Sequence, residues 1–350
     1  MSTTYAYVGC RTTKERNARG KGIRVFRVLT DGTWIAVQTV AAGSNPSYLC
    51  TDCTGNYLYA IHGDFSEITS FSIASDGTLC ILNTLSTGGI NPVHLCVDPS
   101  NRWVYVANLQ SGTVAVLPRQ ADGRLGGLKE LYPLPGKTPG DVSHPHQVQL
   151  DPTGDYLAVS CQGRKAGFGQ VDLFRINHDQ GTLQSTCVAH SREIAEPRHF
   201  VFHSNCRWGY GVNEKDYSVT FYHTDLVHGT LEAKQILPTL PDTYTGEGWA
   251  SGIVMMPDET HIAVSNRKHD SITSFAIDPV TGMLRYCSCE KSGGGQPRFI
   301  TVTPQGTILA ANETTDTLTQ ITMAPDDGHL QRTDWKMETE SPVCVIFNEK

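Results

Sequence analysis

The sequence has no long hydrophobic run and no excess of basic residues. No stretch approaches the roughly 18 consecutive apolar residues of a membrane-spanning helix, and residues 1–9 lack the charged and then apolar pattern of a signal peptide. The 350 residues carry a formal net charge of −7, so a broad electrostatic attraction to nucleic acid or to an anionic membrane is not expected. We therefore expect a soluble, cytoplasmic protein that binds neither nucleic acid nor membranes.

The sequence also lacks a cysteine pattern typical of a disulfide-bonded or zinc-binding protein. Its eleven cysteines are an odd number, and most lie inside apolar runs, which favours buried thiols in a reducing compartment. Cys50 and Cys53 have C-x-x-C spacing, but no second pair and no histidine pair stands at a zinc-like interval. Asp98, Asp151 and Asp258 lie in Asp-Pro or Pro-Asp turns, where hydrogen bonding to the local backbone is expected rather than calcium binding. We expect no metal and no cofactor.

Motifs for nucleotide binding and for a serine nucleophile are missing as well. The sequence has no G-x-S-x-G motif. Gly136-Lys137-Thr138 resembles the end of a phosphate-binding loop, but Leu131 stands where the first glycine of that loop belongs. The glycine-rich segment 292–296 precedes an expected strand, so it lacks the helix N-terminus that would bind phosphate. The nucleophile of any hydrolytic reaction is therefore expected to be water.

What the sequence does contain is one unit of alternating apolar and polar residues, repeated seven times. Each unit ends in a hairpin whose turn carries a glycine, for example 68–79 (ITSFSIASDGTL) and 170–183 (QVDLFRINHDQGTL). These glycines recur about 45 to 58 residues apart, a period typical of β-propellers. The seven turn glycines are Gly32, Gly77, Gly123, Gly181, Gly229, Gly282 and Gly328.

A second pair of strands precedes each of these hairpins, and in most units a proline opens it, as in 91–108 and 144–160. Seven units of four strands predict an all-β fold, a seven-bladed β-propeller with four antiparallel strands per blade. Residues 5–8 resemble a second strand and residues 341–347 a first strand, so pairing of the two termini is expected to close one blade. We predict a single domain over residues 1–350; two β-sandwiches in series are the alternative.

Propeller geometry predicts which side chains share one mouth of the central channel. In each blade the start of the first strand and the end of the second strand lie at that mouth. Residues that follow the opening prolines are His94, His146, Arg198, His199 and Arg298. Residues at the ends of second strands are Asn108, Asn213, Glu214, Asn266, Arg267, Asn312 and Glu313. Neutral turn formers would suffice at these positions, whereas the sequence places cations, carboxylates and imidazoles there.

The loops expected above the same mouth are rich in basic residues. They contain Arg11, Lys14, Arg16, Arg19, Lys21, Arg164, Lys165, Lys215 and Lys268. In a protein of negative net charge, such a rim would concentrate an anionic ligand. Ordinary solvated surface charge is the alternative interpretation, above all for residues 14–21.

These residue types suit hydrolysis or lactone formation on a molecule that bears a carboxylate or a phosphate. Arginine holds an anion through two parallel N–H donors and polarises a carbonyl, and a histidine that titrates near neutral pH can activate water. Glu214 can orient His146, or it can act as the base itself if it is partly desolvated, and the sequence leaves both roles open.

Four segments resemble the seven-bladed β-propeller lactonase family, which includes propeller-type 6-phosphogluconolactonase and 3-carboxy-cis,cis-muconate lactonizing enzyme. They are HPHQVQLDPTG (144–154), EPRHFVFH (196–203), YGVNE (210–214) and SNR (265–267). The resemblance covers essentially the whole chain. It implies a lactonase whose catalytic residues are His146, Glu214, Arg198 and Arg267. The neighbouring side chains expected to bind substrate are His94, His199, Arg298, Asn213, Asn266 and Arg164.

The leading hypothesis is hydrolysis of a small anionic sugar lactone by metal-independent attack of water. Among the substrates of the family that the chain resembles, the basic rim makes 6-phosphogluconolactone, an intermediate of the pentose phosphate pathway, the leading candidate. One alternative is a carboxymuconate lactonizing enzyme that uses the same residues for proton transfer. Another is a non-catalytic propeller that binds a protein partner, since fold does not determine function. A monomer or a weak homo-oligomer is expected.

Overall fold

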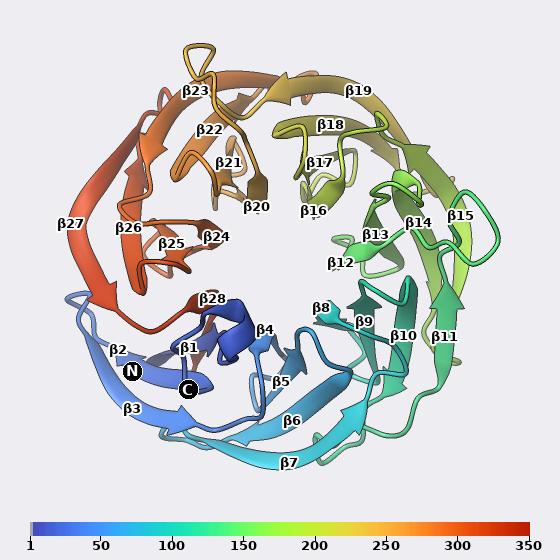
Figure 1. Ribbon diagram of the computed structural model, residues 1–350, viewed down its shortest axis with the longest axis vertical. Coiled ribbons are helices and arrows are strands. Elements are labelled where there is room, and N and C mark those ends of the chain that lie inside the picture. The colour runs from blue at the N-terminus through green and yellow to red at the C-terminus, as the bar shows by residue number, and fades with distance from the viewer. Residues whose placement is uncertain (1–2) are drawn as a thin grey trace.

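The computed structural model describes residues 3–350 and consists of seven four-stranded antiparallel sheets, arranged as blades around a ring (Figure 1). The predicted all-β, seven-bladed propeller is confirmed. Within the described residues, the helical structure is one short 3₁₀ turn, η1 (Lys14–Arg16). The part of the chain that the structure describes contains no helix with the length and apolar character of a membrane span.

The blades follow one another around the ring in chain order, and each runs from an inner to an outer strand. Blade 1 consists of β28 (Pro342–Glu349), β1 (Thr4–Cys10), β2 (Ile23–Val28) and β3 (Trp34–Val40). Blade 2 consists of β4 (Pro46–Thr51), β5 (Tyr57–His62), β6 (Glu67–Ile73) and β7 (Leu79–Ser86), and blade 3 of β8 (Pro92–Val97), β9 (Trp103–Asn108), β10 (Thr113–Pro118) and β11 (Glu130–Pro133). Blade 4 consists of β12 (Pro145–Leu150), β13 (Tyr156–Gln162), β14 (Gly169–Asn177) and β15 (Thr182–His190), and blade 5 of β16 (Pro197–Phe202), β17 (Trp208–Asn213), β18 (Ser218–Asp225) and β19 (Thr230–Pro238). Blade 6 consists of β20 (Ala250–Met255), β21 (His261–Asn266), β22 (Ser271–Ile277) and β23 (Leu284–Lys291), and blade 7 of β24 (Pro297–Val302), β25 (Ile308–Asn312), β26 (Thr317–Met323) and β27 (Leu330–Glu338).

The two ends of the chain complete blade 1 together, as the sequence predicted. The C-terminal strand β28 is the inner strand and pairs antiparallel with β1, from Thr4 opposite Glu349 to Cys10 opposite Pro342. The N and C labels of Figure 1 lie close together in this blade. Ladder hydrogen bonds between the first and last strands therefore hold the ring closed and leave these strands paired rather than exposed as edges.

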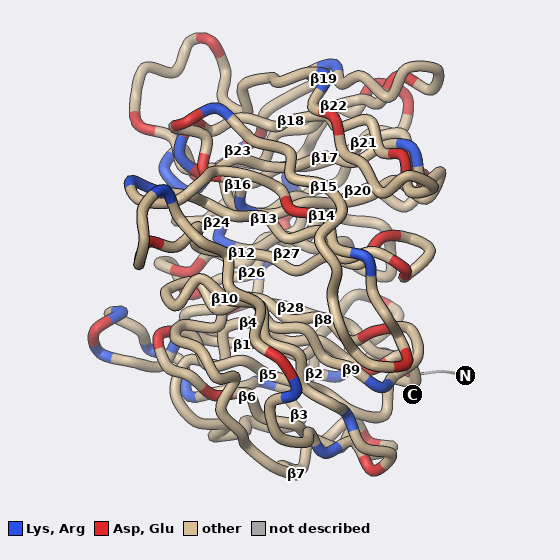
Figure 2. The backbone as a smooth tube through the Cα atoms, turned by 90° about the vertical axis from the view of Figure 1, so that its right-hand side faces the viewer, with Lys and Arg blue, Asp and Glu red and all other residues tan. Residues whose placement is uncertain are grey.

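The core lies between neighbouring blades rather than around one centre. Successive side chains of a strand point to opposite faces of its sheet, so each blade packs against the blade before it and the blade after it. One such cluster joins Tyr7 and Val25 of blade 1 to Leu49, Leu58 and Phe71 of blade 2. A side view of the molecule shows that charged residues concentrate in the loops at the two faces of the disc (Figure 2). Charged side chains that contact a ligand are therefore expected in these loops.

Six of the seven turn glycines, all but Gly32, lie close to a side chain of the preceding blade. All seven have φ between 66° and 84°, the left-handed region that glycine adopts without a steric penalty. At Gly123 of blade 3, a Cβ atom would overlap the Tyr57 ring of blade 2. The Tyr59 hydroxyl of blade 2 also donates a hydrogen bond to the Gly123 carbonyl at 3.0 Å. Glycine is needed here for both the backbone conformation and the close approach of the neighbouring blade.

Replacing Gly123 with Ala is expected to lower the free energy of unfolding by about 2 to 4 kcal/mol, because backbone strain and overlap with Tyr57 add. Gly32→Ala is the matched control. Gly32 has the same positive φ, 84°, but a Cβ there meets no atom within 4 Å, so only the strain of about 1 kcal/mol is expected. Urea unfolding followed by circular dichroism measures both variants. Equal losses of stability would contradict the packing role of Gly123.

The aspartates at the blade turns have the local role that the sequence predicted. The Asp98 carboxylate accepts the backbone N–H of Trp103 at 2.8 Å, and the Asp151 carboxylate accepts that of Tyr156 at 2.7 Å. Asp258 likewise accepts the backbone N–H of Thr260 at 3.1 Å. These carboxylates stabilise the turns between strands.

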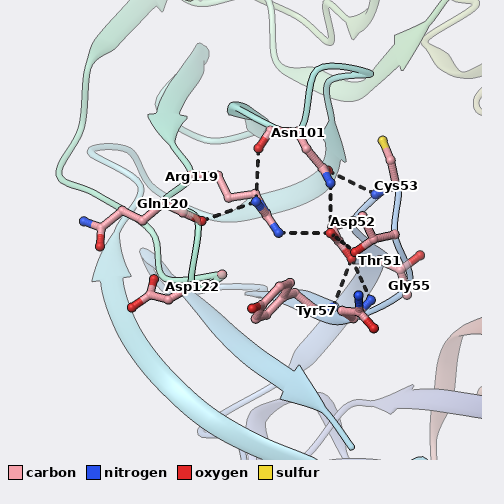
Figure 3. A network of polar contacts seen from close by, with 12 residues as sticks. Thr51, Asp52, Cys53, Gly55, Tyr57, Asn101, Arg119, Gln120 and Asp122 are labelled. Atoms are coloured by element: carbon pink, nitrogen blue, oxygen red, sulfur yellow. Dashed lines mark hydrogen bonds and ion pairs between the residues drawn. The ribbon is translucent and has the colours of Figure 1, made fainter. Parts of the chain in front are cut away.

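The C-x-x-C segment belongs to one of these turns and to a polar network between blades 2 and 3 (Figure 3). The Asp52 carboxylate accepts the Tyr57 backbone N–H at 3.0 Å and forms an ion pair with Arg119 of blade 3 at 3.0 Å. Asn101 donates to Asp52 at 2.9 Å and accepts the Cys53 backbone N–H at 3.0 Å. This segment therefore fastens two blades together. All eleven cysteines are free thiols, and the cytoplasmic location stays a prediction.

Candidate active site

A β-bulge near the start of the inner strands re-aims one side chain into the central channel. The strand register shifts after Pro145, Pro197 and Pro297, so the next residue in each strand has no partner opposite it. A bulge turns the unpaired side chain away from the regular alternation of the strand. Six such bulge residues from six blades line a small cavity on the channel axis: Ser47, Val93, His146, Arg198, Arg298 and Val343. The local backbone thus brings three of the predicted site residues together.

The ends of the second strands divide their side chains between the blade interior and the channel. The Asn213 side-chain amide donates to the hydroxyls of Ser218 and Thr220 at 2.8 and 3.0 Å, inside its own blade. The Asn266 amide is buried in the same way, and the next residue along each strand, Glu214 or Arg267, lines the channel. The structure therefore does not bring Asn213 and Asn266 to the cavity wall, because a strand that points one residue inward points its neighbour outward.

A cavity of about 560 Å³ opens above the bulge residues at the mouth that the sequence predicted. Its volume lies within the range of ordinary small-molecule sites. The predicted site residues in its wall are His146, Arg164, Glu214, Arg267 and Arg298. Beneath it lies the small axial cavity of about 20 Å³, which Arg198 and His199 line.

Glu214 is the centre of a buried charge cluster. One of its oxygens, Oε2, lies 2.9 Å from Arg198 Nε and 3.0 Å from Arg267 Nη2, and it accepts a hydrogen bond from Gln162 at 2.9 Å. Burial by itself would raise the pKa of the Glu214 carboxyl, but the charges of Arg267 and Arg198 outweigh it and hold that pKa below its ordinary value. Glu214 is therefore an ionised anchor for two arginines.

Two further cavity residues are not among those that the sequence predicts: Gln162 and Trp249. Gln162 ends β13, where the second strands of blades 3, 5, 6 and 7 end in asparagine, and its carbonyl oxygen also accepts hydrogen bonds from Arg164 at 3.0 and 3.2 Å. Trp249 precedes β20, the inner strand that opens without proline, and the Arg267 guanidinium lies over its ring at 5.4 Å. An alignment of the seven units with one another would have exposed both as departures from the repeat.

His146 lies in the walls of both cavities as a neutral imidazole. Burial, and then the positive charge of Arg198, lower the pKa of His146 well below its ordinary value. Its Nδ1 is buried and has no hydrogen-bond partner among residues 3–350. Glu214 therefore does not orient His146 through that nitrogen, and Nε2 is left as the nitrogen that can accept a proton from the cavity side.

His94 and His199 form a layer below His146. The His199 ring centroid lies 5.3 Å from that of His146 and 5.6 Å from that of His94, and the His94 ring packs against Tyr48 at 4.0 Å. Burial and the charge of Arg198 lower the pKa of His94 to about 3. Neither histidine lines the larger cavity, so the structure places both beneath the predicted substrate site rather than in its wall.

The three buried histidines predict a steep acid dependence of stability. They stay neutral in the folded protein, whereas in the unfolded chain they take up protons below about pH 6.5. Each then lowers the free energy of unfolding by about 1.4 kcal/mol per pH unit as the pH falls. Urea unfolding between pH 7.5 and 5.0 should show this slope. H94F should reduce the slope by the contribution of one proton, about 1.4 kcal/mol per pH unit. H329Q, at an exposed turn, is the control, and an unchanged slope in H94F would contradict the assignment.

Arginines from blades 1 and 7 line the opposite side of the cavity. Arg11 and Arg16 both pair with Asp64, the former at 3.0 Å, and Arg19 pairs with Asp316. The arginines of this loop therefore form part of the predicted basic rim. In total the wall contains six arginines, Arg11, Arg16, Arg19, Arg164, Arg267 and Arg298, and three glutamates, Glu15, Glu214 and Glu313. The cavity carries net positive charge in a protein of negative net charge.

Comparison with known proteins shows similarity over nearly the whole chain. Residues 5–347 match the family model described as lactonase, 7-bladed beta-propeller. A 6-phosphogluconolactonase of Bacillus subtilis is 27% identical over 355 residues, which cover 99% of each chain. A 6-phosphogluconolactonase of Formosa agariphila is 28% identical over 93% of this chain and 94% of its own. The solved periplasmic gluconolactonase of Pseudomonas aeruginosa superposes with a TM-score of 0.88, is 26% identical and covers 99% of both chains.

Proposed function

This chain belongs to the seven-bladed β-propeller lactonase family, and on that premise we propose that it hydrolyses 6-phosphogluconolactone to 6-phosphogluconate. In this reaction a water oxygen bonds to the lactone carbonyl carbon and the bond from that carbon to the ring oxygen breaks. The ring oxygen leaves as a hydroxyl group, and the product is a hydroxy acid. The two curated relatives described above carry the name of this activity.

The observation that carries the proposal is a neutral, buried imidazole in the same cavity wall as a buried arginine. His146 supplies an unprotonated nitrogen, and Arg267 supplies a cation held in place by Glu214 and by the Trp249 ring. Acyl transfer needs both, because water must lose a proton as it attacks and the carbonyl oxygen gains negative charge.

His146 acts as the general base and then as the general acid. It takes the proton of the attacking water, and the imidazolium that forms returns that proton to the leaving ring oxygen. The same burial that lowers the pKa of His146 makes this imidazolium a strong proton donor. The proton is thus transferred from water to the ring oxygen without a lasting charge on His146.

Arg267 stabilises the oxyanion. Glu214 and Arg198 hold the Arg267 guanidinium in position. Arg267 lies in the cavity wall, whereas Arg198 lies beneath it and reaches the Ser251 carbonyl oxygen at 2.8 Å. Glu214 joins the two guanidinium groups through a single oxygen. We therefore assign Glu214 a positioning role in place of the base role that the sequence left open, and Arg198 a positioning role in place of the catalytic role that the family resemblance implied.

The experiment that tests the proposal is pH-stat hydrolysis of freshly prepared 6-phosphoglucono-1,5-lactone, with spontaneous ring opening subtracted. Unphosphorylated gluconolactone is measured beside it, and cis,cis-muconate-type acids are tested for ring closure by ultraviolet absorbance. Turnover of the phosphorylated lactone well above the spontaneous rate is expected. Ring closure of a muconate-type acid without lactone hydrolysis would favour a lactonizing enzyme, and no reaction with any of these compounds would contradict the proposal.

A further inference from the structure

The cavity has two cationic sides, and the proposed chemistry uses only one of them. His146, Glu214 and Arg267 come from blades 4, 5 and 6, whereas Arg298 and Arg11 come from blades 7 and 1. Both sides line one continuous cavity of about 560 Å³. In Figure 1 the short helical turn η1, drawn in dark blue, lies beside the inner strand β28 of blade 1, and Arg16 of this turn lines the cavity.

The arginines on the second side are incompletely paired. Arg11 is 3% exposed, and its buried Nε has no hydrogen-bond partner among residues 3–350. Arg11 and Arg16 share the single carboxylate of Asp64. A buried guanidinium donor without an acceptor is costly unless a ligand or a water supplies one.

Arg298 is the least satisfied of these cations. Its one ion pair is with Glu313 at 3.7 Å, which is longer than a hydrogen bond, and its side chain remains 22% exposed on the cavity. No other ion pair of Arg298 is present in the part of the chain that the structure describes. Its planar group can therefore present two parallel N–H donors to a ligand.

The cations of the cavity wall repel one another, and the carboxylates beside them offset this only in part. Burial, and then the charge of Arg298, lower the pKa of Arg11 to about 10. Arg298 also acts on Arg198 and Arg267 in the same direction. The charge of Arg298 thus acts on arginines of both the Glu214 cluster and the Asp64 cluster, and each of these clusters has two arginines for one carboxylate.

We propose that Arg298 and Arg11 form a subsite for the phosphate group of the substrate, separate from the side of the cavity that carries the hydrolytic residues. A phosphate monoester brings a charge of about −1.5 to −2 at neutral pH and three acceptor oxygens. That charge matches the excess of positive charge between the two clusters, whereas a carboxylate brings only one negative charge. This inference rests on the proposed function, because it assigns the other end of the same lactone.

The test measures selectivity rather than activity alone. The quantity is the ratio of kcat/KM for 6-phosphogluconolactone to kcat/KM for gluconolactone. R298Q is expected to lower this ratio about 10- to 100-fold, the range of a lost hydrogen bond to a charged group. R102Q is the control, since Arg102 lies in the turn between β8 and β9, is paired with Asp179 at 3.3 Å and does not line the cavity. The ratio of R102Q should stay within about threefold of the wild-type ratio, because an exposed charge outside the cavity contributes little to binding there.

A binding measurement separates failure of the subsite from failure of the reaction. Calorimetric titration with 6-phosphogluconate and with gluconate needs no turnover. Weaker binding of 6-phosphogluconate to R298Q, with unchanged binding to R102Q, would support the subsite even if wild-type protein hydrolysed neither lactone. An unchanged ratio in R298Q, an equal loss in R102Q, or no preference of wild-type protein for the phosphorylated acid would overturn it. R11Q provides the second variant, with folding checked by circular dichroism, and the same loss is expected.

Discussion

Replacing His146 with Ala is expected to lower kcat for the phosphorylated lactone by about 100- to 10,000-fold, the range of general acid–base catalysis. The reason is that His146 is the neutral imidazole in the cavity wall, and its removal leaves water without a proton acceptor there. KM should change far less than kcat, because the cationic groups that hold the substrate remain. Steady-state pH-stat kinetics on the purified variant measure both constants.

His144 supplies the control for this variant. It is the other histidine of the His-Pro-His segment, has a positive φ of 54°, and its Nδ1 lies 3.0 Å from the Leu109 carbonyl oxygen. Asparagine tolerates that backbone conformation, so H144N should fold and keep a kcat close to that of the wild type. Equal kcat values for H146A and the wild type would show that another group activates the water.

Arg267→Lys is the second substitution with a large expected effect. Loss of one good donor to a developing oxyanion lowers kcat by about 100- to 1,000-fold. Lysine keeps the positive charge, but its ammonium cannot both pair with Glu214 and lie flat on the Trp249 ring as the guanidinium does at 5.4 Å. The expected result is a loss of kcat with the fold retained.

Lys268 is the matched control for Arg267. It is the next residue, and its ammonium lies over the same Trp249 ring at 4.6 Å, but it does not line the cavity. K268Q should therefore keep kcat within about twofold, as expected for an exposed charge. If R267K retained wild-type kcat, or if K268Q lost as much as R267K, the oxyanion role of Arg267 would be wrong.

The ring itself could be predicted from the sequence because its signals are local. Each turn glycine marks a left-handed residue in a hairpin, and alternation along the strands marks the two buried faces of each blade. The terminal strands fit the same repeat, so their pairing across 349 and 4 follows from counting units. These features depend on neighbours in the chain and need no knowledge of the site.

The composition of the site could be predicted only in part. His146, Arg198 and Arg298 follow prolines at equivalent positions, and all three lie on the channel as expected. The sequence could not decide between Asn213 and Glu214, because they are consecutive residues at the end of one strand and a register of one residue determines which of them points inward.

What the sequence by itself determined is the repeated blade, its closure through the termini and the mouth at which the charged residues gather. Only the tertiary structure decided the roles within that mouth. Glu214 joins Arg198 and Arg267 from two blades, and Arg298 is left with one long ion pair. Such pairings join residues from different blades, and the charge state of each group depends on its burial and on neighbours distant in the chain.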